Sequence, residues 1–243
     1  MSILKLLTIS TLIIQNLSAF ECKAFDKASL EVGGLRGSFD GYMQVGKESA
    51  TKLDLKNDLD LQGSKNSIQA SLQSGSKKHK FGFKATKFKY SGKKKLSKNI
   101  LFNSENFAKA TIVKSKLDIR WAKAKYRYVA YDSLSIGLDL NALRLKSQIN
   151  ETKYKKNILI PALAVDYDIP LAADLSLVTK SSLTLFGKSR YTDGYAGLAY
   201  KMPFQNCSSL HIGYQASSFK INTSKLKSKL NYKGLYAGVR VKF

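Results

Sequence analysis

The last nine residues of the sequence, Leu235-Tyr236-Ala237-Gly238-Val239-Arg240-Val241-Lys242-Phe243, decide the fold. Apolar side chains alternate there with side chains that are polar or absent. Because successive side chains of a β-strand point to opposite faces, this alternation predicts a strand with one apolar and one polar face. The apolar face is expected to carry Leu235, Ala237, Val239, Val241 and Phe243.

The aromatic residue at the end of this strand is a second signal. A closing strand with outward apolar residues and a terminal Phe resembles the C-terminal signal of bacterial outer-membrane β-barrels, which assembly machinery recognises. Val239, Val241 and Phe243 match that signal. The resemblance implies an outer-membrane barrel with the barrel assembly machinery as a partner.

Length and composition fit one large domain. The chain has 243 residues, of which 44% are hydrophobic. No internal stretch reaches the roughly 18 to 20 consecutive apolar residues that a membrane helix needs. A closed barrel is the other way to satisfy every backbone group in lipid. The predicted fold class is therefore all-β, a transmembrane antiparallel up-and-down barrel; a soluble β-sandwich or barrel is the alternative.

The N-terminal residues have the organisation of a secretory signal peptide. Lys5 supplies the basic start, residues 6–14 form a short apolar core, and Leu17-Ser18-Ala19 offers a cleavage site. We expect a signal peptide at residues 1–19 and a barrel domain at residues 20–243. Cleavage after Ala24 is the alternative.

Nine further segments alternate like the last one, which predicts ten strands. Eight or twelve strands are the alternatives, because residues 53–61 and 106–116 are ambiguous; we favour a structured loop for residues 53–61. The connections alternate between long or basic (44–63, 91–108, 150–156) and short (74–76, 132–133, 172–174), and a Lys-rich loop is expected at residues 224–229. Outer-membrane barrels have long extracellular loops and short periplasmic turns. An even strand count then places both termini in the periplasm.

Two strands are expected to contain irregularities. The apolar face of the first strand changes phase at Gly33-Gly34, which predicts a β-bulge there. Beyond the bulge the apolar outward face would carry Leu35, Phe39 and Met43. A second change of phase would similarly place Phe88 and Tyr90 on the outward face.

Proline and aromatic residues give further positional expectations. Pro161 cannot donate to a strand ladder, so it is expected near the upper rim or at a bulge. Aromatic residues near the short turns predict an interfacial girdle of Phe81, Tyr128, Phe204 and Phe243.

The net charge of +24 raises three interpretations. Nucleic-acid binding is disfavoured, because the chain is expected to be exported and its lysines are not part of an aromatic-basic module. Binding to the phosphates of lipopolysaccharide in the Gram-negative outer leaflet is electrostatically favoured, and simple solvation of loops and lumen is the third interpretation. The expected contacts to lipopolysaccharide or an external partner are Lys93, Lys94, Lys95, Lys225, Lys227 and Lys229.

The polar strand faces predict a charged lumen. The expected lumen charges are Glu31, Arg36, Asp40, Lys123, Lys125, Arg127, Asp139, Asp166, Asp168 and Arg240. In a barrel of this size side chains can fill the interior, which favours a plugged barrel of structural or interaction type. A narrow anion-preferring, porin-like channel is the alternative, because basic linings favour anions.

Several ordered motifs resemble a known family. They are Val32-Gly33-Gly34, residues 53–59, residues 134–140, Ile160-Pro161-Ala162-Leu163, Gly213-Tyr214-Gln215 and residues 233–238. Together they resemble a family of small proteobacterial outer-membrane β-barrel proteins with an N-terminal Gly-Gly. The resemblance covers most of the mature chain and implies a fold and a location, without catalytic residues.

Catalytic and metal chemistry have little support in the sequence. The two histidines, His79 and His211, lack the partners that a general base needs, and no Asp-x-His pair occurs. No Cys/His spacing indicates a metal site, and no cofactor is expected. We therefore predict a protein that is not an enzyme. Cys22 and Cys207 would lie on the same side of the membrane, so a disulfide between them is a separate expectation.

Overall fold

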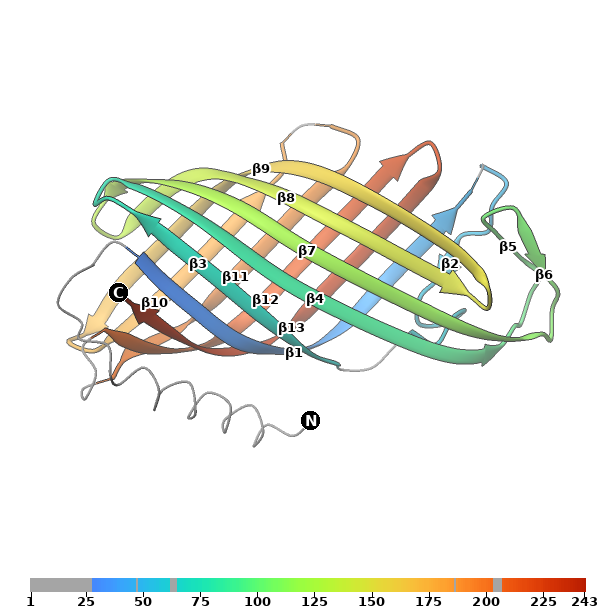
Figure 1. Cartoon of the computed structure of the whole chain (residues 1–243), viewed down its shortest axis with the longest axis horizontal. Coiled ribbons are helices and arrows are strands. Elements are labelled where there is room, and N and C mark those ends of the chain that lie inside the picture. Colours follow the sequence, from blue (N-terminus) through green and yellow to red (C-terminus); the bar gives the residue numbers. More distant parts are fainter. Residues whose placement is uncertain (1–27, 47, 62–64, 186, 203–206) are drawn as a thin grey trace.

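Ten antiparallel strands of the described chain form a closed ring (Figure 1). They are β1 (Ala28–Val45), β3 (Lys65–Gly75), β4 (His79–Lys95), β7 (Ile112–Tyr131), β8 (Leu134–Ile149), β9 (Thr152–Ala172), β10 (Leu175–Leu183), β11 (Arg190–Lys201), β12 (Ser208–Thr223) and β13 (Leu226–Lys242). The computed structural model describes residues 28–46, 48–61, 65–185, 187–202 and 207–243. The prediction of an all-β barrel with ten strands is confirmed.

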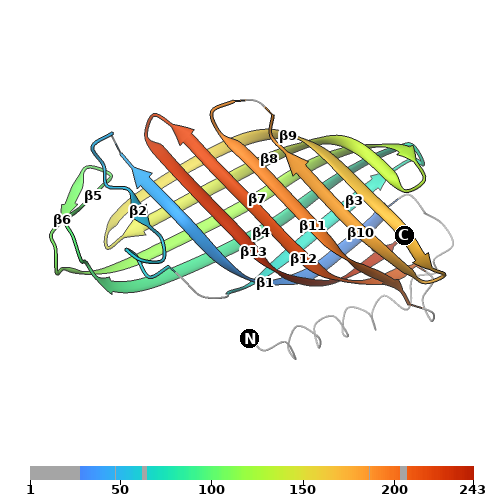
Figure 2. The same cartoon turned by 180° about the vertical axis from the view of Figure 1, so that it is seen from behind.

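The first and last strands close the ring (Figure 2). They pair without interruption from Ser29 opposite Lys242 to Val45 opposite Leu226. The predicted faces of the last strand are confirmed near its end, since Leu235 is 63% exposed. Closure gives the terminal strands of the sheet a partner, as a barrel in lipid requires.

The barrel wall has two zones of opposite polarity, which we call the lipid zone and the aqueous zone. The lipid zone is the part near the short turns, where apolar side chains point outward. Every barrel strand contributes a large exposed apolar side chain to it: Leu30, Leu72, Phe83, Tyr128, Leu138, Leu163, Leu183, Leu198, Ile212 and Leu235. Of the predicted aromatic girdle, Phe81, Tyr128 and Phe243 are exposed at this end.

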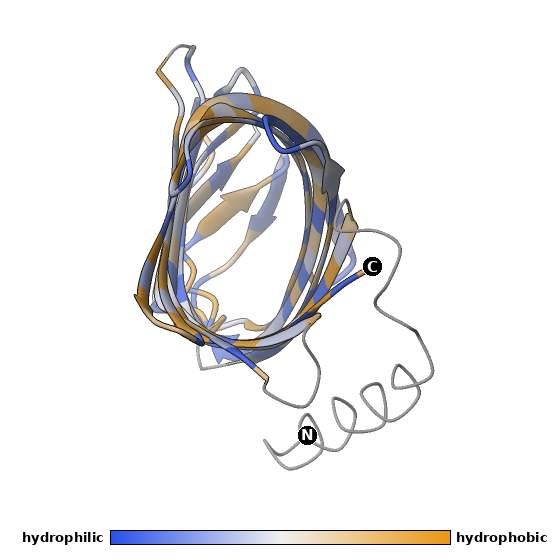
Figure 3. Cartoon of the chain, turned by 90° about the vertical axis from the view of Figure 1, so that its left-hand side faces the viewer, coloured by the Kyte–Doolittle hydropathy of each residue, from blue (hydrophilic) through white to orange (hydrophobic). Residues whose placement is uncertain are grey.

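In the aqueous zone, at the opposite end, the alternation continues with its polarity inverted. In β13 the outward residues Lys227, Lys229 and Lys233 lie in the aqueous zone, and outward Leu235, Ala237 and Val239 follow in the lipid zone. Figure 3 shows this mixture of polar and apolar colour along the strands of the closed ring. The exterior therefore changes from a surface suited to lipid to one suited to water.

An apolar core fills the interior of the aqueous zone. It includes Leu35, Phe39, Met43, Phe88, Leu117, Trp121, Leu143, Leu145, Ile221 and Leu230, each at most 4% exposed. Because water lies outside this part of the wall, burying these side chains inside is favourable. The long strands thus build a conventional hydrophobic core on top of a membrane barrel.

The segment between β1 and β3 completes this core. Pairing between β1 and β3 stops at Gly37, which is opposite Lys65, the first residue of β3. Strand β1 continues to Val45. The short β2 (Leu53–Asp54) pairs with this free part of β1, and the segment buries Leu53, Leu55, Leu59 and Leu61. The prediction of a structured loop at residues 53–61 is confirmed. The hairpin of β5 (Ile100–Phe102) and β6 (Glu105–Phe107) buries Ile100, Phe102 and Phe107 in the same core.

Both predicted changes of phase are wrong. β1 pairs with β13 and with β3 in one continuous register through Gly33-Gly34. Leu35, Phe39 and Met43 point inward, as do Phe88 and Tyr90 of β4. The expectation assumed that apolar side chains face lipid along the whole strand, whereas the inverted polarity of the aqueous zone explains the same sequence without a bulge.

Three of the predicted loops are also partly wrong. Residues 152–156 of the expected loop 150–156 belong to β9, and residues 226–229 of the expected loop 224–229 belong to β13. Likewise β4 continues through Lys95 into the expected loop 91–108. Strands of up to 21 residues exceed the 9 to 11 residues that cross a bilayer, because the wall continues beyond the membrane.

Pro161 lies in the middle of β9, at neither of its expected places. It is opposite Leu140 of β8. On the other side of β9, pairing with β10 ends at Leu163 opposite Leu183. Pro161 is therefore just beyond the end of a ladder, where a missing amide hydrogen costs little, and its carbonyl accepts a hydrogen bond from Thr184 Oγ1 at 3.0 Å.

Some predictions fall outside the described residues. They concern the signal peptide at 1–19, the alternative site after Ala24, Cys22 and Phe204. Cys207 is in a disulfide bond; its pairing with Cys22 stays a prediction. No helix in the described part of the chain is long and apolar enough to cross a membrane.

Candidate functional site

A layer of charged side chains crosses the lumen inside the lipid zone. Its centre is Asp139 of β8, whose side chain is fully buried. Lys123 Nζ lies 3.0 Å from one carboxylate oxygen, and Arg127 donates to the other at 2.8 Å. Ser182 of β10 donates a further hydrogen bond at 2.6 Å. Strands that are not neighbours in the wall are thereby connected through the lumen.

Asp193 of β11 extends this network. Lys123 Nζ lies 2.9 Å from its carboxylate, which also accepts hydrogen bonds from Gln215 at 3.1 Å and Ser217 at 2.6 Å. Asp193 was absent from the predicted lumen charges. The alternation of Tyr191, Asp193 and Tyr195 along β11 is the signal that could have found it.

A second cluster lies where β1 and β13 close the ring. Glu31 accepts hydrogen bonds from Tyr236 Oη at 2.6 Å and from Arg240 Nε at 3.0 Å. Gly33 leaves room for the tyrosine ring, because a Cβ there would lie 2.5 Å from Tyr236 Cε2. Gly33, the inward residue of the Gly-Gly pair, thus makes space for the packing of Tyr236.

The predicted lumen charges divide into three groups. Those on the inward face are Glu31, Lys123, Lys125, Arg127, Asp139, Asp166 and Arg240. Asp168 shares that face of its strand but is exposed. The prediction is wrong for Arg36 and Asp40, which alternate with inward Leu35 and Phe39 and so point outward. Both were assigned inward because of the bulge that β1 lacks; Asp40 instead accepts a hydrogen bond from Asn231 at 2.7 Å.

The two histidines lie apart, towards the short-turn end. His79 Nδ1 is 2.9 Å from Tyr126 Oη, and His211 Nε2 is 2.9 Å from Ser209 Oγ. Each contacts a hydroxyl group, and neither has an ion pair with a carboxylate among the described residues. Within the same residues, no group of three or more His, Cys, Asp and Glu side chains could hold a metal ion.

In the part of the chain that the structure describes, packed side chains occupy the lumen in both zones. The cavity in the charged layer measures about 30 Å³, room for one or two water molecules. Above it, Trp121, Tyr191 and Phe219 pack with ring centroids 4.9 to 5.7 Å apart. The apolar core continues from these rings towards the far end of the barrel.

The outer surface of the aqueous zone is basic, and most strongly so on one side. We call the outward residues of β4, β7, β8 and β9 in this zone the basic wall. Its cations are Lys87, Lys89, Lys93, Lys95, Lys114, Lys116, Arg120, Arg144, Lys146, Lys153 and Lys155, and its only carboxylate is Asp118.

The lowest row of the basic wall adjoins the lipid zone. Lys87 is directly opposite Arg120, which in turn is directly opposite Arg144. Two residues further down, the outward positions of the same strands are Ala85, Ala122 and Ala142. Cations in three adjacent strands thus lie at the height where the outer surface changes from apolar to charged.

The predicted lipopolysaccharide contacts form two groups in the structure, one on β4 and one on β13 with the turn before it. Lys93 and Lys95 belong to the basic wall, but Lys94 alternates inward and donates a hydrogen bond to the carbonyl of Asn57. The other group is on β13 and the turn before it: Lys225, Lys227 and Lys229, with Lys227 Nζ 3.3 Å from Glu48. Only Lys225 of the six lies in a turn.

Comparisons with known proteins agree with the architecture. No protein-family model and no curated protein matches the sequence. The chain is similar in structure to the outer-membrane protease OmpT of Escherichia coli, with a TM-score of 0.62 and 9% identity over 92% of this chain and all of that one. The fold is that of a bacterial outer-membrane β-barrel.

Two further structures give weaker matches. The translocator domain of the autotransporter NalP from Neisseria meningitidis has a TM-score of 0.47 and 10% identity, over 97% of this chain and 95% of that one. Neisserial surface protein A has a TM-score of 0.40 and 14% identity, over 89% and 97%. The match to the protease structure, at 9% identity, supports the fold and leaves the activity open.

Proposed function

We propose that this protein is a closed, non-catalytic barrel of the Gram-negative outer membrane, with both termini in the periplasm. Its basic wall binds the phosphate groups of lipopolysaccharide in the outer leaflet. The observation that carries the proposal is the density of cations on β4, β7, β8 and β9, where eleven cations accompany one carboxylate. The lowest row of these cations adjoins the lipid zone, which is the height expected for lipid phosphates.

The row of Lys87, Arg120 and Arg144 supports a phosphate ligand in particular. Like charges directly opposite each other on neighbouring strands are destabilising unless an anion lies between them. A phosphate can bridge two such cations, and the planar guanidinium groups of the two arginines suit paired hydrogen bonds to its oxygens. The acidic neighbour of the row, Asp118, lies 3.6 Å from Arg120 and offsets only part of this charge.

The test replaces the three cations of this row with glutamine. In the variant K87Q/R120Q/R144Q we expect the affinity of the refolded protein for purified lipopolysaccharide to fall roughly a hundredfold, from about 1 kcal/mol per cation near an anionic surface. Binding is measured by titrating lipopolysaccharide into protein held in zwitterionic phospholipid nanodiscs. Lipopolysaccharide from which the phosphates have been removed should bind as weakly to the wild type.

The matched control is K225Q/K227Q/K229Q, which removes the same charge from the β13 side. The control should keep most of the affinity, because these lysines lie outside the basic wall and Lys227 already contacts Glu48. Equal losses in the two variants would refute the assignment to the basic wall. Unchanged binding after removal of the phosphates would refute the phosphate chemistry itself.

A closed lumen accords better with the geometry than the alternative, a narrow anion-preferring channel. Ions would have to pass the packed rings of Trp121, Tyr191 and Phe219 and the apolar core above them. Refolded protein inserted into a planar bilayer should therefore give no discrete conductance steps. Regular steps with anion preference would refute the closed barrel and favour the channel.

A further inference from the structure

The cavity in the charged layer has more cations than carboxylates around it. Its lining includes the cations Lys84, Lys123, Lys125, Arg127 and Lys180 but only the carboxylates Glu31, Asp166 and Asp193. A buried charge without a partner is costly, so such a layer is expected to recruit a counter-charge or to lose protons.

Each carboxylate of the lining lies within 3.0 Å of a cation. Glu31 pairs with Arg240, Asp166 with Arg127 at 2.9 Å, and Asp193 with Lys123 at 2.9 Å. Asp139, just outside the lining, is held by Lys123 and Arg127 as well. With Asp139 and Arg240 included, the layer has six cations and four carboxylates, an excess of two positive charges.

Three ammonium groups remain. Among the described residues, no carboxylate oxygen lies within 4.0 Å of Lys84, Lys125 or Lys180. Lys84 has a long hydrogen bond to Gln215 at 3.4 Å and lies 5.1 Å from the Trp121 ring centroid. Lys180 lies 5.4 Å from the centroid of Tyr195, and Lys125 has no polar side-chain partner in the described part of the chain.

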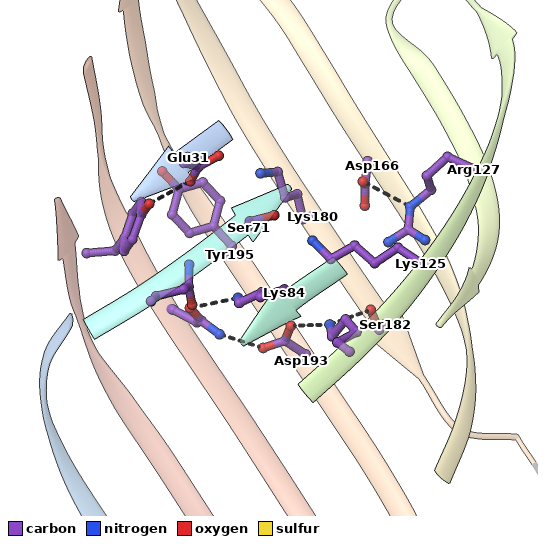
Figure 4. A pocket seen from close by; sticks show the side chains of 14 residues that line it. Glu31, Ser71, Lys84, Lys125, Arg127, Asp166, Lys180, Ser182, Asp193 and Tyr195 are labelled. Carbon is purple, nitrogen blue, oxygen red and sulfur yellow. Dashed lines mark hydrogen bonds and ion pairs between the residues drawn. The ribbon is translucent and has the colours of Figure 1, made fainter. Parts of the chain in front are cut away.

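These three side chains come from different strands and reach into one space. Figure 4 shows Lys84 of β4, Lys125 of β7 and Lys180 of β10 directed into the cavity. The cavity of about 30 Å³ is large enough for a monatomic anion or a water molecule and too small for an organic ligand.

We propose that the lumen holds a small inorganic anion, of the size of a halide, bound between Lys84, Lys125 and Lys180. The anion offsets part of the excess positive charge and lies next to the ammonium groups that have no carboxylate within 4.0 Å. It thereby connects β4, β7 and β10 inside the lipid zone. This site is separate from the basic wall and does not depend on lipopolysaccharide binding.

The probe is bromide, with gluconate as the anion too large for the cavity. Thermal unfolding of the refolded protein in neutral detergent is compared in sodium bromide and in sodium gluconate at equal ionic strength. We expect a higher midpoint temperature in bromide, rising with its concentration, because an anion that binds only the folded state stabilises it. Equal midpoints in the two salts would overturn the proposal.

The variant K125Q/K180Q removes two of the three ammonium groups. Its midpoint should be the same in both salts, and in gluconate it should exceed that of the wild type, because the repulsion between cations is gone. The matched control, K153Q/K155Q, removes the same charge from the outer surface and should keep the bromide effect. A bromide effect retained in K125Q/K180Q would overturn the site.

A second measurement does not depend on how the variant folds. Crystals of the wild-type protein soaked in bromide should show an anomalous-scattering peak in the cavity between Lys125 and Lys180. Bromide peaks confined to the outer surface would show an adventitious ion only and would refute the lumen site.

Discussion

The two zones of the wall predict how much a charged side chain at each outward position of β8 lowers the free energy of unfolding. Outward residues of this strand are apolar from Leu134 to Ala142 and polar from Arg144 to Gln148. Substituting lysine one at a time at positions 134, 136, 138, 140, 142 and 148 should therefore give a profile of destabilisation that follows depth in the membrane.

The magnitude follows from the geometry of the strand. Leu134 to Ala142 spans eight residue steps, about 27 Å of strand at roughly 3.4 Å per residue. With a strand tilt of about 40° this gives a height of about 21 Å, close to the roughly 25 Å of an outer-membrane apolar band. Leu138 then lies near the midplane, where lysine costs about 2–4 kcal/mol, falling to about 0–1 kcal/mol at the edges.

The assay is reversible unfolding in denaturant with the protein in phospholipid vesicles. Trp121, the single tryptophan of the chain, reports the transition because it is buried in the folded state. We expect the largest loss of unfolding free energy for L138K and almost none for Q148K, which lies in the aqueous zone. A flat profile, or an equal loss at Gln148 and Leu138, would refute the boundary between the zones.

The remaining predictions concern the core, the closing strands and the disulfide. L145A should lower the free energy of unfolding by about 2–5 kcal/mol, because it opens a cavity in a packed core at a side chain that is 0% exposed; a loss below about 0.5 kcal/mol would contradict that core. E31Q should cost about 3–5 kcal/mol by leaving the charge of Arg240 unpaired, and E31Q/R240M should regain most of it; if the double variant is no more stable than E31Q, the ion pair is not the cause. Peptide mapping of the mature protein without reductant should recover Cys22 linked to Cys207, and finding both as free thiols would exclude the bond.

Much of the fold could be predicted because strand patterns are local. The faces of the last strand follow from a period of two, which depends only on the neighbouring residues. The ten-strand count and the structured loop at residues 53–61 followed from the same patterns and the polar segments between them.

The candidate sites were less predictable, since they depend on contacts across the lumen and around the wall. Arg36 and Asp40 were placed inside because apolar Leu35 and Phe39 were assumed to face lipid. Lys93, Lys95, Lys153 and Lys155 of the basic wall were assigned to loops because strands were expected to end at the membrane surface. Alternation along a strand shows which residues share a face. It does not show whether that face meets lipid, water or the lumen.

The sequence by itself determined that this chain forms alternating strands and which residues share each face, because the pleat of a strand is a local property. Only the tertiary structure decided which medium each face meets. The same outward face of β13 meets water at Lys229 and lipid at Leu235, since the closed wall extends beyond the membrane. Tertiary structure also decided the ion pairs: Lys123 meets Asp193, 70 positions away, because closing the ring turns their strands toward each other across the lumen.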